Sequence, residues 1–151
     1  MVSRPAPAEI LFHDAFAVMA SAENPLTRRR KLTWADLADE PWTLFPLDNI
    51  FGSLVADAFR ATGLEPPRVS VTSESFIVQR ELLATGRFLT VLPGFMLKFP
   101  HRGLPLRALP VSLTNSGVPV GIITLKDRTL TPPAQLFIAR LRERARPLPA
   151  S

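Results

Sequence analysis

The segment WTLFPLDNIFGSLVADAFRATGLEPPRVSVT, residues 42–72, decides the fold, because it has the pattern of one strand–helix–strand unit. Residues 42–45 form a short apolar run that a proline closes, which is typical of a buried strand. Residues 50–62 carry apolar side chains at helical spacing, and Gly63 follows them as a C-cap. The β-branched stretch 68–72 predicts a second strand. A strand, a crossover helix and another strand indicate an α/β sheet.

The flanking sequence continues this alternation of short elements. We expect strands at 10–20, 42–45, 68–72, 88–92, 106–110 and 118–126, helices at 50–62, 75–85 and from Thr131 to about Arg146, short helical turns after Thr33 and at 94–99, and a turn at 115–117. Thr33 and Thr131 are the expected N-caps of their elements. Alternating short apolar strands and helices predict an α/β sheet that is buried on both faces.

The two later helices are each predicted to carry apolar side chains at helical spacing. These side chains are Phe76, Val78, Leu82 and Leu83 in the first and, on one face, Ala134, Phe137, Ile138, Leu141 and Ala145 in the second.

The composition is that of a folded domain with a sizeable core. The chain has 151 residues, of which 46% are hydrophobic and 21% charged, so most of its length is not expected to be disordered. It has no cysteine, which excludes disulfides, a thiolate nucleophile and a cysteine zinc site. No apolar run is long enough for a membrane span, and the first residues lack the apolar core of a signal peptide. We therefore expect a cytoplasmic protein without a membrane partner.

A net charge of +5 raises the question of nucleic-acid binding. The basic residues form one dense run, Arg28–Lys31, and a group at alternate positions from Arg140 to Arg146. Alternate positions do not form one stripe on a helix. No helix-turn-helix or zinc-finger pattern accompanies them. A solvated basic surface is the better interpretation, and we expect no direct nucleic-acid contact from this chain.

Candidate catalytic groups are few. His13 is followed by Asp14 within a predicted strand, so the two side chains point to opposite faces. His101 lies in a loop, and neither histidine has a partner at metal-ligand spacing. No nucleophile elbow, P-loop or dinucleotide fingerprint is present. We expect neither an enzyme nor a cofactor or metal site.

The carboxyl ends of three predicted strands are the candidate ligand site, because ligands bind at this edge of α/β sheets, near helix N-termini. Residues 46–51 have an alternative interpretation as a plain loop between a strand and a helix. Ser73 and Ser75 have an alternative interpretation as helix-capping residues. Both interpretations are compatible with a ligand, since a capped helix start is also where an anion would bind. The candidate ligand-binding residues are Pro46, Leu47, Asp48, Asn49, Ile50, Phe51, Ser73, Ser75, Phe76, Leu92 and Pro93.

The order of motifs is more specific than any one of them. NPL at 24–26 follows the first strand, and LADEPWTLFP at 37–46 places a proline and a tryptophan before a buried strand. LVADAF at 54–59 is followed by GLEP, and ELLATG at 81–86 is followed by VLP. Together with the closing strand and helix, these stretches resemble the C-terminal, effector-binding half of LysR-type transcriptional regulators, over roughly residues 10–146.

The resemblance implies a fold like that of periplasmic binding proteins, with two α/β subdomains joined by two crossover strands. Here it implies the second subdomain at 20–122, crossovers at 15–21 and 121–125, and a closing C-terminal helix. Residues 1–9 and 147–151 would be a flexible lead and tail. The resemblance also implies a small organic acid or related metabolite as effector, bound in a cleft, and a homodimer that passes on the signal.

Two departures from the family pattern stand out. Arg87 replaces a flexible position between Gly86 and Phe88. The DNA-binding domain and most of the first subdomain have no counterpart, so we expect an N-terminally truncated effector-binding domain that binds its ligand weakly. Bare apolar surface on the first strand and last helix would promote self-association. The alternative is a stand-alone small-molecule-binding or protein-interaction module of the same fold without a direct regulatory role.

Overall fold

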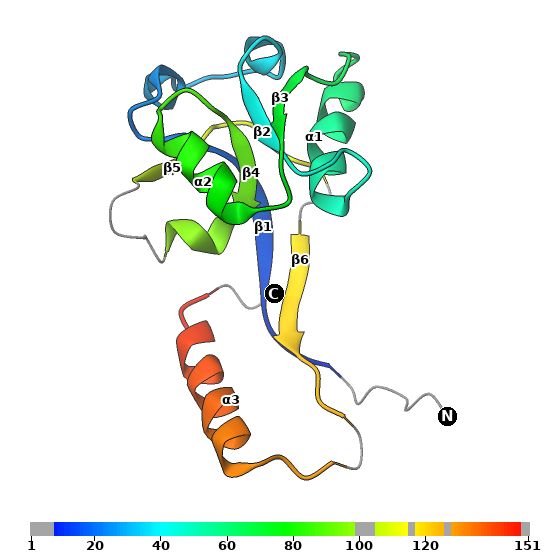
Figure 1. Cartoon of the computed structure of the whole chain (residues 1–151), viewed down its shortest axis with the longest axis vertical. Coiled ribbons are helices and arrows are strands. Elements are labelled where there is room, and N and C mark those ends of the chain that lie inside the picture. The colour runs from blue at the N-terminus through cyan, green and yellow to red at the C-terminus, as the bar shows by residue number, and fades with distance from the viewer. Residues whose placement is uncertain (1–7, 99–104, 115–116, 126–127, 149–151) are drawn as a thin grey trace. The chain divides into compact units, whose positions relative to one another are not determined.

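The computed structural model describes residues 8–98, 105–114, 117–125 and 128–148 (Figure 1). The chain divides into a larger unit, Ala15–Ser116, and a smaller unit made of Met1–Asp14 and Gly117–Ser151. Several predicted features lie outside the described residues, namely His101, the turn at 115–116, Lys126 and most of the expected lead and tail. No helix within the described ranges combines the length and the apolar character that crossing a membrane requires.

The larger unit contains a parallel and an antiparallel set of strands. β2 (Trp42–Leu44) and β3 (Val69–Thr72) run parallel, and their connection is the predicted helix α1 (Ile50–Ala61). β1 (Glu9–Ser21) lies antiparallel between β4 (Thr90–Pro93) and β5 (Leu106–Ala108). A parallel bridge between Trp42 and Leu89 joins the two sets. The α/β prediction is confirmed, and the antiparallel pairing of β1 is a feature that the alternation of elements does not reveal.

Both faces of this sheet are covered, as the sequence predicts. Alternate residues of β1 enter different cores, since Val18 packs in the cluster that contains Phe59 of α1, whereas Met19 packs with Leu83 of α2 (Phe76–Ala84). Figure 1 shows α1 and α2 beside the strands of this unit. The period-2 alternation of strand side chains explains how one apolar strand serves both cores.

The predicted helix ends are formed largely as expected. Gly63 and Gly86 have φ values of 76° and 77°, the left-handed conformation that glycine adopts most easily. Asn49 and Ser75 cap α1 and α2 with their side-chain oxygens. Thr131 holds the N-cap position of α3 (Pro132–Ala145), but its side chain makes no capping hydrogen bond.

The turn after Thr33 has the predicted capping contact, although its bounds differ by one residue. A 3-10 helix, η2, covers Ala35–Leu37, so Trp34 holds the formal N-cap position. The hydroxyl of Thr33 accepts the N–H of Asp36 at 3.4 Å, as a capping residue does. Thr33 also donates its N–H (2.8 Å) and its hydroxyl (2.7 Å) to the carboxylate of Asp36, which accepts a further hydrogen bond from Arg29 (2.9 Å). The carboxylate of Asp36 therefore stabilises the start of the turn at Thr33.

These contacts make the turn sensitive to acid. The hydroxyl and N–H of Thr33, and then Arg29, lower the pKa of Asp36 from 3.8 to about 2. A carboxylate whose pKa is lower in the folded state stabilises it above pH 3.8, and this contribution is lost as the pH falls through about 2. We expect Asp36→Asn to lower the urea midpoint at pH 5 and to differ little from wild type at pH 2. The control is Asp57→Asn, which removes a more exposed carboxylate paired with Arg60. Equal urea midpoints for Asp36→Asn and wild type at pH 5 would show that the ionised carboxylate of Asp36 does not stabilise the fold.

In the smaller unit, β6 (Gly117–Ile122) pairs with β1 and is followed by α3. A Cβ at Gly121 would lie 2.5 Å from the carbonyl oxygen of Glu9, so only glycine permits this approach. The Glu9 carboxylate accepts two hydrogen bonds from Arg142, from Nε at 2.8 Å and from a terminal nitrogen at 2.7 Å. This bidentate pair ties the start of β1 to α3.

One prediction for this unit needs correction, since β6 ends at Ile122 rather than continuing to residue 126. On α3, Ile138 and Ala145 are buried, whereas Phe137 is 64% exposed, which agrees with the bare apolar surface expected on the last helix. Helical spacing identifies an apolar face but not whether another element covers it.

Candidate functional site

The carboxyl ends of β2, β3 and β4 carry the predicted ligand-binding segments, and the structure brings these segments together. Ser73 donates its N–H to the carbonyl of Leu44 at 3.0 Å, which places the residues after β3 beside those after β2. The ring centroid of Phe45 lies 5.4 Å from that of Phe51 and 5.1 Å from that of Phe76. Aromatic contacts therefore join residues from three separate positions along the chain.

The end of β4 is linked to the same aromatic group through β1. Phe16 is the antiparallel partner of Pro93, and its ring centroid lies 5.2 Å from that of Phe51. The neighbouring residue Leu92 is buried with Met19 and Leu83, so its side chain belongs to the core. Pro93 is therefore the candidate residue of this segment that its pairing places next to the aromatic group.

The start of α1 is held tightly against the loop that follows β2. Asn49 accepts the N–H of Phe51 on its side-chain oxygen at 2.9 Å, and its own N–H donates to the carbonyl of Pro46 at 2.9 Å. A Cβ at Gly52 would collide with the carbonyl oxygens of Pro46 and Phe45. The loop from Pro46 to Asn49 thus has a defined shape, although Ile50 is 71% exposed.

The start of α2 is capped by serine hydroxyls. The Oγ of Ser75 accepts the N–H of Val78 at 3.4 Å, and the Oγ of Ser73 accepts the N–H of Ser75 at 3.1 Å. Capping, the alternative interpretation of these serines, is therefore present. A hydroxyl that accepts one hydrogen bond still carries a proton to donate, so capping and ligand contact are compatible.

The ionised side chains at this site are negative, whereas the helix N-termini contribute partial positive charge. Asp48 and Glu74 carry the formal charges, and the segments 46–51, 72–76 and 92–95 contain no lysine or arginine. The N-termini of α1 and α2 supply partial positive charge and N–H groups. An anion at this edge would be held by backbone amides and hydroxyls.

The apolar residues predicted for α2 are only partly buried, and a polar residue joins them in the core. The structure buries Gln79 and Leu83, whereas Phe76 is 47% exposed and Val78 is 43% exposed. Gln79 donates its amide N–H to the carbonyl of Ser73 at 2.8 Å and accepts the hydroxyl of Thr90 at 3.1 Å. Gln79 lies four positions before Leu83 and therefore on the same face of the helix, which was the available signal. The apolar residues Phe76, Val78 and Leu82 made this face difficult to recognise from the sequence.

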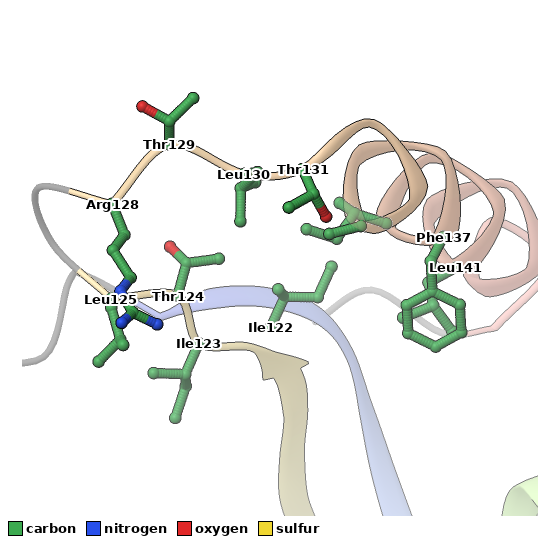
Figure 2. A pocket seen from close by; sticks show the side chains of 12 residues that line it. Ile122, Ile123, Thr124, Leu125, Arg128, Thr129, Leu130, Thr131, Phe137 and Leu141 are labelled. Carbon is green, nitrogen blue, oxygen red and sulfur yellow. The ribbon is translucent and has the colours of Figure 1, made fainter.

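A second feature that the sequence did not predict is a hollow in the smaller unit. It has a volume of about 440 Å³ and lies between the end of β6, the loop 128–131 and α3 (Figure 2). None of the predicted ligand-binding residues lines it. Its walls are formed by Ile122, Ile123, Thr124, Leu125, Arg128, Thr129, Leu130, Thr131, Ala134, Phe137, Ile138 and Leu141.

Comparison with known proteins identifies relatives with the same architecture. The chain is 36% identical over 120 residues to the HTH-type transcriptional regulator GbpR of Azospirillum brasilense, an alignment that covers 79% of this chain and 35% of GbpR. The chain thus spans about a third of the length of this relative. The regulatory domain of Synechocystis PCC6803 CcmR, solved in complex with 2-PG, matches with a TM-score of 0.69 at 19% identity, covering 99% of this chain and 74% of that chain.

A further solved structure, the effector-binding domain of QuiR in complex with shikimate, matches with a TM-score of 0.58 at 13% identity and covers 93% of this chain and 66% of that chain. At these identities the two solved structures show a shared fold. The model of the LysR substrate binding domain matches residues 5–146, which is nearly the whole chain. The chain therefore belongs to the LysR substrate-binding domain family of transcriptional regulators.

Proposed function

We propose that this chain is the effector-sensing module of a LysR-type transcriptional regulator. It binds a small organic acid or related metabolite at the site formed by segments 46–51, 73–76 and 92–93. The observation that carries the proposal is that Phe51 and Phe76, from the first two segments, both contact Phe45, with two capped helix starts at the same edge. The ligands named for CcmR and QuiR, 2-PG and shikimate, are examples of the chemistry that this edge would suit.

Binding to the 151-residue chain is expected to be weak, because a quarter of the CcmR regulatory domain has no counterpart in the alignment. A dissociation constant on the order of 1 mM corresponds to only about 4 kcal/mol of binding free energy. Amide chemical shifts detect such weak complexes. We expect titration with 2-PG to move the amide signals of residues 47–51 and 74–78 more than those of α3. Shifts confined to the smaller unit would refute this site.

A single charge should weaken this complex. Asn49→Asp keeps a capping oxygen for the N–H of Phe51 but places a carboxylate at the site. We expect the dissociation constant for 2-PG to rise about tenfold, because repulsion between two nearby charges near a protein surface is worth about 1–2 kcal/mol. The measurement is the same amide-shift titration at constant ionic strength.

The matched control makes the same change of amide to carboxylate elsewhere. Gln135→Glu lies on the exposed surface of α3 and should leave the affinity unchanged. Equal weakening by both variants would assign the effect to net charge rather than to this site.

The signalling part of the proposal concerns populations of states. An effector shifts a conformational equilibrium only by its difference in affinity between the states. In the proposed regulator, effector binding favours one state and contacts between protomers transmit the bias. In this proposal the chain makes no direct contact with nucleic acid, catalyses no reaction and acts in the cytoplasm. The limits 20–122 for the second subdomain and 10–146 for the partial domain belong to the same proposal.

We also propose that the chain forms homodimers, with the bare apolar side chains of the smaller unit in contact with a second copy. Ile123 and Phe137, which line the same hollow, are 70% and 64% exposed, and Leu136 of the same helix as Phe137 is 62% exposed. The double variant Ile123→Ser with Phe137→Asp should reduce the mass at high concentration to that of a monomer in light scattering. The control is Ile77→Ser, which removes a comparably exposed side chain from α2. A monomeric wild type would contradict this part of the proposal.

A further inference from the structure

Gln79 has an unusual environment for a polar residue in a nine-residue helix. Its side chain is fully buried, and both ends of its amide are used. The nitrogen donates to the carbonyl of Ser73 at 2.8 Å, and the oxygen accepts the hydroxyl of Thr90, itself fully buried, at 3.1 Å. A carbonyl can only accept, so the bond to Ser73 fixes which way the amide points.

The two partners of Gln79 belong to different segments of the candidate site. Ser73 is the first residue after β3, and Thr90 begins β4. The N–H of Gln79 also donates to the carbonyl of Ser75 at 3.1 Å, within the first turn of α2. One residue therefore connects the end of β3, the start of α2 and the strand that leads to Leu92 and Pro93.

We propose that Gln79 is a positioning residue of the effector site. It holds residues 73–78 in register with β4 and thereby sets how the start of α2 presents its hydroxyls and N–H groups. This inference rests on the proposed function for its effect on affinity, but its effect on the geometry of residues 73–78 is independent of any ligand. Gln79 itself is covered by α2 and the sheet and would not touch the effector.

Glutamate at this position gives a sharp test because it imitates glutamine only when it is protonated. A neutral carboxyl group donates one hydrogen bond and accepts another, which is the pattern that Ser73 and Thr90 require. An ionised carboxylate has no proton to donate, and it would face the carbonyl oxygen of Ser73. Burial raises the pKa of a carboxyl group, so the change falls in an accessible pH range.

The first measurement needs no ligand. In Gln79→Met, we expect amide hydrogen exchange at Ser75 and Val78 to accelerate about five- to tenfold, since one hydrogen bond contributes about 1 kcal/mol. In Gln79→Glu, the same acceleration is expected at pH 8 and should vanish at pH 5. Thr90→Val removes one of the two bonds and should have a smaller effect, whereas Thr90→Ser keeps the hydroxyl and should restore wild-type exchange. A general loss of packing would accelerate exchange regardless of pH in Gln79→Glu, and would not distinguish Thr90→Val from Thr90→Ser.

The second measurement is affinity for 2-PG, taken as a ratio to wild type at the same pH. We expect Gln79→Glu to bind about fivefold more weakly at pH 8 and equally at pH 5, and Gln79→Met to bind more weakly at both. Gln135→Glu and Gln135→Met are the matched controls on the exposed face of α3 and should change neither quantity.

The two measurements separate the two proposals. If wild type binds no 2-PG but the exchange at Ser75 and Val78 responds as described, the choice of effector fails and the positioning role stands. If exchange at these residues is unchanged in Gln79→Met, the positioning role is overturned whatever the ligand result. If exchange responds but the affinities of Gln79→Glu and wild type are equal at pH 8, the role in the site is overturned.

Discussion

Gly52→Ala is expected to destabilise the larger unit by about 3 kcal/mol, at the upper end of the usual cost of overpacking. The added Cβ would collide with the carbonyl oxygen of Pro46 and lie 2.6 Å from that of Phe45. Both neighbours are backbone atoms, so no side chain can rotate away to relieve the contact. Either the start of α1 or the loop from Pro46 to Asn49 must move.

The sign of this effect is informative, because alanine has the higher helix propensity by about 1 kcal/mol. Gly52 lies within α1, so propensity alone would predict stabilisation. The measurement is urea unfolding followed by tryptophan fluorescence, since Trp34 and Trp42 both lie in the larger unit.

Gly117→Ala is the matched control for Gly52→Ala. A Cβ at Gly117 would meet no atom within 4 Å, and this glycine is not among those with positive φ. Because Gly117 lies in the smaller unit, circular dichroism follows the unfolding of both variants alongside fluorescence, and the midpoint of Gly117→Ala should equal that of wild type. A Gly52→Ala protein as stable as wild type would show that the loop before α1 is pliable, which would also weaken its candidacy as part of a preformed site.

Trp42→Ala is expected to cost about 4 kcal/mol, within the range for removing a large aromatic side chain from a core. Trp42 has no exposed surface, and its indole N–H donates to the carbonyl of Leu37 at 2.9 Å. Its ring packs against Phe59 with 6.3 Å between centroids and an interplanar angle of 78°. The substitution leaves a cavity and removes one of the two hydrogen bonds that the carbonyl of Leu37 accepts, the other being donated by the N–H of Glu40 at 3.4 Å.

Two variants separate these terms. Trp42→Phe keeps most of the ring volume but not the hydrogen bond, so its loss of unfolding free energy should be intermediate. Ile77→Ala removes an exposed apolar side chain of α2 and should change the stability by less than about 0.5 kcal/mol. Unfolding is best followed by circular dichroism here, because Trp42 is itself a fluorophore. If Trp42→Ala unfolded at the same urea midpoint as wild type, the core around β2 would not contribute to the cooperative unfolding of the larger unit.

Much of the candidate site was accessible from the sequence because strand ends and helix starts are local features. The proline after residue 45 and the serine at 75 are each visible as a motif, and the rule for α/β sheets places them at one edge. The contacts among Phe16, Phe45 and Phe51 were not accessible. Phe16 joins this group only because β1 pairs antiparallel with β4.

The family resemblance carried by the order of motifs was confirmed by the family model over residues 5–146. The site assignments stay predictions until a ligand is placed. The hollow beside α3 was missed, because its walls come from two segments whose apolar pattern is the same whether or not they are covered.

The sequence by itself determined the element order, the helix ends at Gly63 and Gly86, and the α/β class, because these depend on periodicity and on backbone conformations that few residues adopt. Only the tertiary structure decided which face of α2 is buried. The local apolar pattern includes Phe76, Val78 and Leu83, but docking on the sheet buries Leu83 together with Gln79 and leaves Phe76 and Val78 exposed. A glutamine can occupy that interior because the carbonyl of Ser73 and the hydroxyl of Thr90 satisfy both ends of its amide, and those partners come from strands that only the fold brings together.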